Sequence, residues 1–396
     1  MDAALKVGIV GFGGAGIAQF GHFGNSRACE VVAVFDPNES GINRARAMAP
    51  AVVVTDNFAK FMASGVNTIA VCSPDKTHAD YVIAALEAGK HVVCEKPLTD
   101  SLDGCCRILN AEAKAKSVVA AVQHQMRFVP VHVEMKRLIT SGKLGRISYI
   151  EGYYVHNLTH RASLYSNWRF TDNATPLVYS GCHFVDLLRW LLEDEVHEVV
   201  GMANNIAFPE YPESDLNVLL FRFKSGVIAK VVVAFGAGRP QDHSVRIYGS
   251  EMSIENNLLF SKAGEIEVFA RPHLPKDELD VRNEKPRIYS IRGRGYRASF
   301  NRYRIYWLAQ AFEYLMHRKG YDQEYSICSF PMRLYPHTLA VRASLENFVR
   351  AVQGIEGLRC SLKDSARTVA TCLAGVEAYR TGRTVRVSEF WSPELD

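Results

Sequence analysis

A glycine-rich loop near the start of the chain restricts its possible folds more than any other segment does. Residues 11–16 read Gly-Phe-Gly-Gly-Ala-Gly and follow an apolar run at residues 5–10. Gly11 permits a sharp turn, Gly13 lets the backbone approach a pyrophosphate, and Gly16 lets a helix pack closely on a strand. The order of strand, tight turn and helix therefore predicts a dinucleotide site at a helix N-terminus.

The end of the second apolar run indicates which dinucleotide is bound. The run at residues 29–35 ends at Asp36, about 20 residues after Gly16. A carboxylate there accepts hydrogen bonds from an adenosine ribose and repels a 2′-phosphate, so NAD is favoured over NADP. The alternative is an ordinary glycine turn and a helix-capping aspartate, which this context disfavours. The predicted cofactor-binding residues are Gly11, Phe12, Gly13, Gly14, Ala15, Asp36, Ser73, Pro74, His78, Glu95, Lys96, Gln123 and Arg169.

Further short apolar runs predict a parallel sheet in the first part of the chain. Each run is rich in β-branched residues, as in strands buried on both faces, and helical segments such as residues 77–88 lie between them. The runs occupy residues 51–55, 68–72, 91–94 and 118–122. We expect a doubly wound Rossmann sheet of about six strands, forming a dinucleotide-binding domain over residues 1–124.

The pattern changes in the second part, and 396 residues exceed what one hydrophobic core usually serves. Segments 217–223 and 227–235 flank Lys-Ser-Gly, a good hairpin turn, and indicate antiparallel pairing. We expect residues 125–396 to form an α+β domain with a large open, mostly antiparallel sheet for substrate binding and oligomerisation. Helices are predicted at 303–316, 337–352 and 362–380, and an inserted arm at about 264–334.

Composition and charge indicate the cellular compartment of the protein and the classes of partner that it binds. The net charge of +4 is small for this length and does not indicate nucleic acid or membrane as a partner. Nine cysteines without a C-x-x-C pair fit a reducing compartment better than a disulfide framework or a zinc site. The first strand begins almost at once and no apolar run is long enough to cross a bilayer, so we expect a cytoplasmic protein.

A lysine follows one of the predicted strands at the edge where ligands bind. Residues 94–97 read Cys-Glu-Lys-Pro after the run at 91–94, and ligands of such sheets bind beyond the carboxyl ends of the strands. We expect the Lys96 ammonium to point at the nicotinamide end of the cofactor, and the Lys96-Pro97 bond is free to be cis at modest cost. Local sequence alone favours a plain surface loop, but the position after a strand reverses that preference.

Four segments together identify a family. They are residues 11–16, 95–97, 125–130 and 180–186. The chain resembles the Gfo/Idh/MocA family of dinucleotide-dependent oxidoreductases, which act mostly on sugars, cyclitols and their derivatives. The resemblance spans nearly the whole chain and implies a Rossmann domain plus an α/β domain whose open sheet commonly mediates oligomers, so we expect a homo-oligomer, dimer or tetramer. It also implies that Lys96 is the catalytic lysine near the reacting oxygen and His183 the proton-transfer group.

Elementary chemistry supports these two roles, but one position departs from the family pattern. Alcohol oxidation needs a base in the titration range of imidazole, and an ammonium stabilises developing alkoxide charge. Where relatives usually carry an aspartate, four residues before His183, this chain has Tyr179, and Ala-Thr-Pro at 174–176 replaces the usual glycine cluster. Tyr179 is either a packing residue or an acid that donates or relays a proton. On an α-helix it would share the cleft-facing side with His183.

Other polar groups are predicted to shape the substrate pocket. The predicted substrate-binding residues are Lys96, Arg127, Asn157, His160, Arg161, Trp168, Tyr179 and His183. His156 and His160 have the spacing of metal ligands on a helix, but no helix and no acidic third ligand is evident, so no metal is expected. The basic, tyrosine-rich stretch at 264–334 favours an arm that packs across subunits over a nucleic-acid site. An anionic substrate such as a nucleotide sugar stays open, because arginine suits phosphate.

These observations favour an NAD(H)-dependent oxidoreductase that interconverts a ring secondary alcohol and its ketone on a sugar, glycoside or cyclitol. One alternative is a glycoside-cleaving enzyme whose tightly held NAD oxidises the sugar transiently and is then restored. A second alternative is a non-catalytic sensor of dinucleotide and sugar, against which the presence of both Lys96 and His183 argues.

Overall fold

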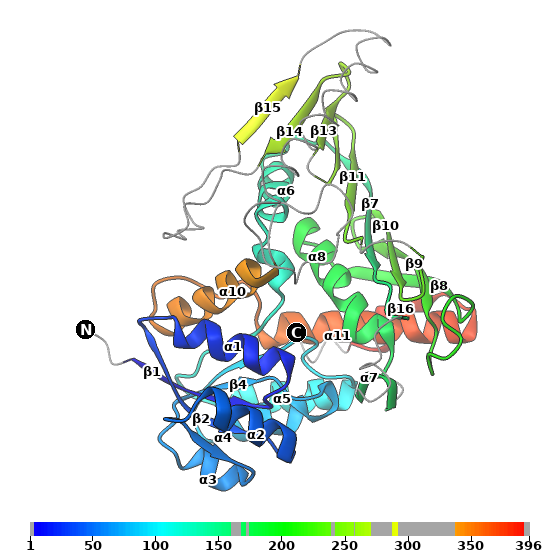
Figure 1. Ribbon diagram of the computed structural model, residues 1–396. Helices are drawn as coiled ribbons and strands as arrows, with labels where there is room; N and C mark the ends of the chain where they lie inside the picture. Colours follow the sequence, from blue (N-terminus) through cyan, green and yellow to red (C-terminus); the bar gives the residue numbers. More distant parts are fainter. Residues whose placement is uncertain are drawn as a thin grey trace.

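The computed structural model describes residues 4–159, 168–171, 174–238, 242–256, 258–270, 287–291 and 337–391. They form two sheets with their helices (Figure 1). The first sheet, blue to cyan, lies at the bottom of that view, and the second, mostly green, rises beside it. Helix α11 (Leu362–Thr381), orange to red, runs between the two.

The first sheet is parallel and six-stranded, in the order β3-β2-β1-β4-β5-β6. Its strands are β1 (Leu5–Val10), β2 (Cys29–Phe35), β3 (Val53–Thr55), β4 (Thr68–Val71), β5 (His91–Cys94) and β6 (Ala120–Val122). The order reverses between β1 and β4, and in open sheets ligands bind at such a switch point. The predicted Rossmann sheet is confirmed.

Helices cover both faces of this sheet. They are α1 (Gly14–Gly24), α2 (Glu39–Met48), α3 (Phe58–Met62), α4 (His78–Glu87) and α5 (Leu102–Lys114), with a 3₁₀ turn η1 (Asp75–Thr77). Helix α1 begins at Gly14, inside the glycine-rich loop, which has too little helix propensity to predict that start.

The second sheet has ten strands, in the order β15-β14-β13-β12-β11-β7-β10-β9-β8-β16. They are β7 (Ile147–Val155), β8 (Val196–Asn204), β9 (Leu216–Phe223), β10 (Ile228–Ala234), β11 (Val245–Gly249), β12 (Met252–Glu255), β13 (Leu258–Ser261), β14 (Ile266–Ala270), β15 (Arg287–Ile291) and β16 (Val385–Arg386). The β7–β10 pair is parallel and the other neighbours are antiparallel. The mostly antiparallel sheet is confirmed, as is the hairpin, which is β9–β10.

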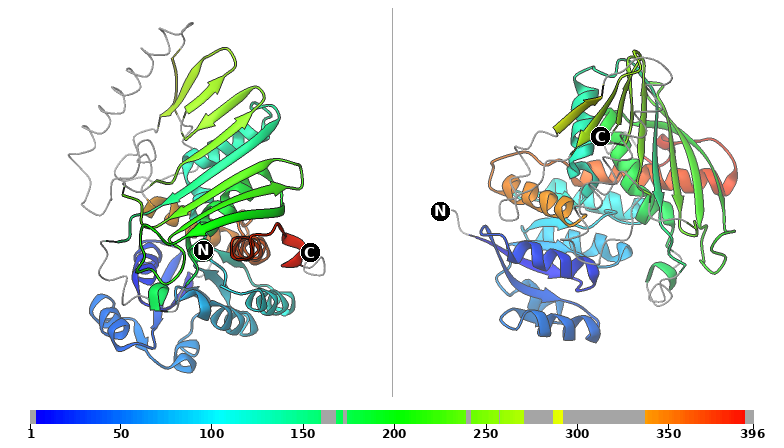
Figure 2. Two further views of the ribbon diagram at one scale, coloured as in Figure 1. Left: turned by 90° about the vertical axis from the view of Figure 1, so that its right-hand side faces the viewer. Right: turned by 45° about the horizontal axis from the view of Figure 1, so that its top comes forward.

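One face of the second sheet carries its helices, as the two views of Figure 2 show. These are α6 (Pro130–Thr140), α8 (Cys182–Leu192) and α11; short turns occur at η2 (Gln125–Phe128), α7 (Trp168–Thr171) and η6 (Val387–Glu389). Side chains alternate along the strands, so Val199 and Leu219 are buried while Leu220 and Met202, 81% exposed, lie on the opposite face. The open face also carries charged residues, such as Glu198 and Arg222, and the predicted homo-oligomer stays a prediction.

The C-terminal helices return to the first domain. Helix α10 (His337–Val352) packs on α1 and β5, and its Phe348 shares a core with Ile9. The first turns of α11 pack on α5 and β6, and Leu362 belongs to the same core cluster as Cys94 of β5. Both helices agree with prediction. The predicted helix at 303–316 and most of the predicted arm lie outside the described residues, and the boundary at residue 124 stays a prediction.

No helix in the described ranges is both long and apolar enough to span a bilayer.

Candidate active site

The glycine-rich loop has the geometry of a phosphate cradle. Gly11 has φ +85°, and a Cβ there would lie 2.9 Å from the Cys72 carbonyl oxygen. A Cβ at Gly16 would lie 2.0 Å from the Gly11 oxygen, so α1 and the loop touch at backbone distance. A Cβ at Gly13 or Gly14 would meet no described atom within 4 Å. The bare N-terminus of α1 therefore stands open beside the switch point and fits a pyrophosphate.

Asp36 is fixed at the rim of this loop. Its carboxylate is buried and accepts the N–H of Phe12 at 2.7 Å and the N–H of Asn38 at 2.8 Å. Gly41 makes room for it, since a Cβ there would lie 2.2 Å from the carboxylate. Arg44 donates to the Phe12 carbonyl from Nε at 3.3 Å and Nη2 at 3.2 Å. An acidic and a basic group thus bind the main chain of Phe12, where a Rossmann fold receives the adenosine ribose.

Two buried amides lie at the carboxyl ends of β5 and β6. Gln19 Nε2 donates to Glu95 Oε1 at 2.8 Å and to Gln123 Oε1 at 2.5 Å. Gln19 Oε1 and Gln123 Nε2 have no hydrogen-bond partner among the described atoms. Buried polar atoms are costly when unpaired, and a carboxamide or ribose hydroxyl would satisfy them. With the glycine loop, these atoms fit a nicotinamide dinucleotide. Glu95 and Gln123 were predicted from the sequence as cofactor-binding residues, which stays a prediction. Gln19, a polar residue on the buried side of α1, was not among them.

His78 supports the site without facing it. The imidazole is fully buried, with Nδ1 2.8 Å from the Pro97 oxygen and Nε2 2.8 Å from the Ser73 oxygen. Both ring nitrogens are therefore engaged by the loops that follow β4 and β5. The predicted cofactor contact of His78 is corrected to a role in holding these loops together.

Lys96 reaches from the first domain to the second. The Lys96-Pro97 peptide is cis, and Lys96 Nζ donates to the Tyr179 carbonyl at 2.7 Å. Tyr179 lies in a π-helical turn (Leu177–Gly181) that leads directly into α8. A π turn changes the carbonyl pairing of an α-helix, and such turns recur at functional sites. The ammonium is thus held against the turn that precedes His183.

The Tyr179 phenol points away from this contact. It is 4% exposed, and its Oη lies 2.8 Å from the Tyr211 Oη. Its ring packs against Phe235 and Trp168, and burial raises the pKa of the phenol well above its usual value. The expectation that both Tyr179 and His183 face the cleft assumed α-helical spacing, which the π turn removes. Tyr179 meets Lys96 through its main chain, as any residue there would.

His183 is the second residue of α8 and lies on an aromatic side chain. Its imidazole is stacked with the Tyr154 ring at 5.7 Å between centroids and 9° between planes. Tyr154 also stacks with His243 at 4.6 Å and 26°. Neither Tyr154 nor His243 was predicted. The available signal was an apolar and aromatic run at residues 147–155, which the structure shows as β7 with Tyr154 next to its carboxyl end.

The other predicted site residues that the structure describes lie in the loops after β4 and β7 and in α7. Asn157 Oδ1 accepts from the N–H and the hydroxyl of Thr159, which shapes the loop after β7. The Arg169 guanidinium lies 4.4 Å from the Trp168 ring and 5.2 Å from the Tyr179 ring. His160 and Arg161 lie outside the described residues. Ser73 accepts from the Thr77 hydroxyl at 2.8 Å and, with Pro74, forms the loop after β4.

Arg127 does not face a substrate. It is 2% exposed and pairs with Asp186 of α8 through Nε at 2.8 Å and Nη2 at 2.6 Å. Its Nη1 reaches Asp364 of α11 and the Arg359 carbonyl, both at 2.5 Å. The predicted substrate contact is corrected to a buried ion network between α8, α11 and the end of the first domain. The distant partners of Arg127 in the sequence explain why no local pattern revealed this.

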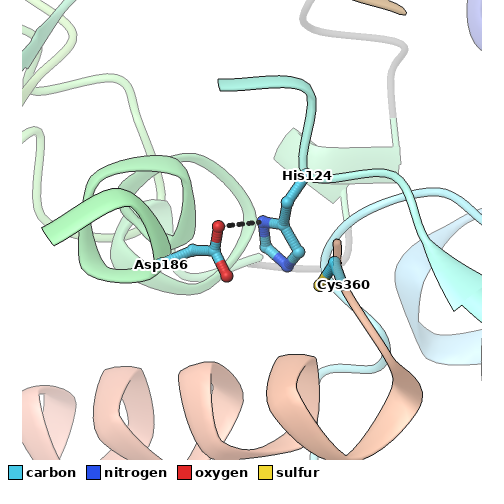
Figure 3. Close-up of side chains that lie close together, drawn as sticks. All are labelled: His124, Asp186 and Cys360. Carbon is cyan, nitrogen blue, oxygen red and sulfur yellow. Dashed lines mark ion pairs between the residues drawn. The ribbon is translucent and has the colours of Figure 1, made fainter. Parts of the chain in front are cut away.

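The same network contains the one group of potential metal ligands in the described ranges, His124, Asp186 and Cys360 (Figure 3). His124 Nδ1 lies 3.5 Å from Asp186 Oδ2, and Nε2 lies 2.9 Å from the Ser365 hydroxyl. The Arg127 guanidinium already supplies the positive charge that Asp186 requires, and burial lowers the pKa of His124 to about 4. We assign no metal to this group.

The network makes stability depend on pH. Burial raises the pKa of Asp364, but Arg127 and Arg189 outweigh it and hold that pKa at about 2. A depressed carboxyl pKa contributes stability above its unfolded value of about 3.9, and this is lost as pH falls towards about 2. We expect the free energy of unfolding, measured by urea titration, to fall from about pH 5 downwards, and less steeply in Asp364→Asn. Equal slopes in the two proteins would contradict this assignment.

Two family models match the chain. One describes an oxidoreductase family with an NAD-binding Rossmann fold and matches residues 5–124, and the other describes the GFO/IDH/MocA C-terminal domain and matches residues 132–255. The chain belongs to the Gfo/Idh/MocA family. It is an NAD(P)-dependent oxidoreductase that acts on CH–OH groups.

The proteins that this chain resembles include inositol dehydrogenases. Inositol 2-dehydrogenase 2 of Saccharopolyspora erythraea is 29% identical over 255 residues, 63% of this chain and 72% of that protein. An inositol 2-dehydrogenase of Klebsiella pneumoniae is 31% identical over 234 residues, 58% of this chain and 67% of that protein. The crystal structure of apo scyllo-inositol dehydrogenase from Lactobacillus casei has a TM-score of 0.73 at 18% identity, covering 98% of this chain and 99% of that chain.

Proposed function

We propose that this family member is an NAD(H)-dependent oxidoreductase that interconverts a ring secondary alcohol and its ketone on a cyclitol. The names of the inositol 2-dehydrogenases among its relatives support the substrate class. A structural neighbour from Lactobacillus casei, with a TM-score of 0.71 at 18% identity over 97% of this chain and 99% of that chain, holds NAD(H) and scyllo-inositol. The observation that carries the proposal is Lys96 Nζ, held 2.7 Å from the carbonyl of the turn that leads into His183.

The roles of the two residues follow from their chemistry. A bound nicotinamide dinucleotide supplies the hydride acceptor for oxidation and the hydride donor for reduction. Lys96 donates a hydrogen bond to the reacting oxygen and stabilises its alkoxide character. His183 takes the hydroxyl proton in oxidation and returns it to the oxygen in reduction. The contact between Lys96 and the Tyr179 carbonyl joins the two domains at the turn before α8. In this proposal the orientation of α8 therefore sets the geometry of proton transfer.

Asp36 supports a preference for NAD. In this proposal its fixed carboxylate binds the adenosine ribose and repels a 2′-phosphate, while the nearby Arg44 would favour that phosphate. Asp36→Asn keeps an acceptor for the Phe12 N–H and removes the charge. We expect the ratio of kcat/KM for NAD over NADP to fall by about tenfold or more in this variant, since like charges in contact cost several kcal/mol.

Steady-state kinetics with both cofactors measures this ratio, and Asp36→Asn combined with Arg44→Ala is the matched control. The second change should reverse most of the gain with NADP. If the unmodified protein uses NADP at least as well as NAD, the assignment of Asp36 is wrong.

A panel of inositols, free sugars and glycosides tests the proposed function. Each is incubated with the protein and excess NAD, while the near-ultraviolet absorbance of reduced nicotinamide and the products are followed. Net reduction with a cyclitol supports the proposal. Aglycone release without net reduction would support the glycoside-cleaving alternative, and binding of both ligands with neither product would support a sensor.

A further inference from the structure

Tyr154, whose ring stacks with His183, lies in a closely packed part of the second sheet. Tyr154 precedes Val155, the last residue of β7, and its ring is partly exposed. Besides the two imidazoles, Phe184 and Phe235 approach it edge-on, at 72° and 73° with centroids 6.4 Å away. Contacts on the face and the edges of the Tyr154 ring hold it in one orientation. The imidazole that stacks on it therefore meets a ring whose plane is fixed.

A glycine on β7 allows the start of α8 to pack closely beside this ring. Gly152 and Tyr154 are two residues apart on β7 and therefore point to the same side. A Cβ at Gly152 would lie 2.3 Å from Phe184 Cδ1, so the start of α8 sits on bare backbone there. That close approach places His183, the neighbour of Phe184, over Tyr154.

The Tyr154 ring lies parallel to the His183 imidazole. The side chain at position 179 is directed elsewhere, because the Tyr179 phenol pairs with Tyr211. A stacked aromatic ring restricts rotation of the imidazole, and it also favours the protonated form by cation–π attraction after proton transfer.

We propose that Tyr154 is a positioning residue for His183, with its ring fixing the plane of the imidazole for proton transfer. The proposal rests on the proposed function, because proton transfer is the step that the orientation serves. His243 also stacks on this ring. Neither side chain is assigned a contact with the substrate.

Substitutions at Tyr154 separate the ring from the hydroxyl. Tyr154→Phe keeps the stack, and we expect its kcat to stay within about twofold of wild type. Tyr154→Leu removes it, and we expect kcat to fall by roughly 10- to 100-fold, as for a displaced catalytic group, with KM and the dissociation constant for NAD little changed. Tyr153→Leu is the matched control, because that neighbouring ring contacts Lys230 and Arg246 instead. It should retain the wild-type kcat.

A second measurement does not depend on turnover. The imidazole proton signals of His183 in NMR spectra, assigned by their loss in His183→Gln, are shifted by the ring current of Tyr154. They should move in Tyr154→Leu and stay in place in Tyr154→Phe. An unmoved signal or a wild-type kcat in Tyr154→Leu would overturn the positioning role alone. If the signals move in Tyr154→Leu but the wild-type protein oxidises no cyclitol, the proposed function is overturned, and the positioning role with it.

Discussion

Lys96→Met should lower kcat by roughly 10²- to 10³-fold while the protein still binds NAD, because the ammonium serves the reacting oxygen and not the dinucleotide. The variant also loses the hydrogen bond to the Tyr179 carbonyl, which is the direct link between the lysine loop and the turn before His183. Stopped-flow turnover with a cyclitol and calorimetric titration with NAD measure the two properties separately.

Lys90→Met is the matched control for Lys96→Met. Lys90 Nζ also donates to a main-chain carbonyl, that of Val66 at 2.6 Å, but it lies before β5 and not after it. We expect near-wild-type turnover in this variant. Near-normal turnover in a folded Lys96→Met protein would show that Lys96 has no catalytic role.

His183→Ala should reduce kcat by roughly 10²- to 10⁴-fold, the usual contribution of a general base. It should also abolish the rise of rate with pH that a titrating imidazole produces. Tyr179→Phe should cost little, since the phenol pairs with Tyr211 and the carbonyl that holds Lys96 is retained. Rate profiles against pH for the three proteins test this together. If Tyr179→Phe lost most of its turnover while His183→Ala kept it, Tyr179 and not His183 would be the proton-transfer group.

Elements defined by local periodicity were predictable from the sequence. Strand β5 (His91–Cys94) and helix α10 (His337–Val352) occur with the predicted bounds, because a short β-branched run and a sustained apolar stripe each specify one structure. The start of α1 at Gly14 was not predictable from local periodicity, since glycine has low helix propensity.

Side-chain roles were less predictable than elements, for two physical reasons. Arg127 lies in a family segment and resembles a ligand-binding arginine, but its partner Asp186 is 59 residues away and only the folded chain reveals the pair. Tyr179 was placed by α-helical spacing, and no local pattern marks the π turn that redirects it. The place of Lys96 after β5 was predictable, because in parallel sheets the ligand crevice lies beyond the carboxyl ends of the strands, and its catalytic role stays a prediction.

The central claim is that the secondary alcohol carbon of a cyclitol delivers hydride to a nicotinamide held by this chain. An inositol deuterated at its carbinol carbons, incubated with the protein and NAD, tests it most directly. Mass spectrometry of the recovered cofactor should show one deuterium per reduced nicotinamide and an equal amount of ketone, with neither in Lys96→Met. Reduced cofactor without deuterium, or no reduced cofactor with any inositol at saturating NAD, would contradict the claim.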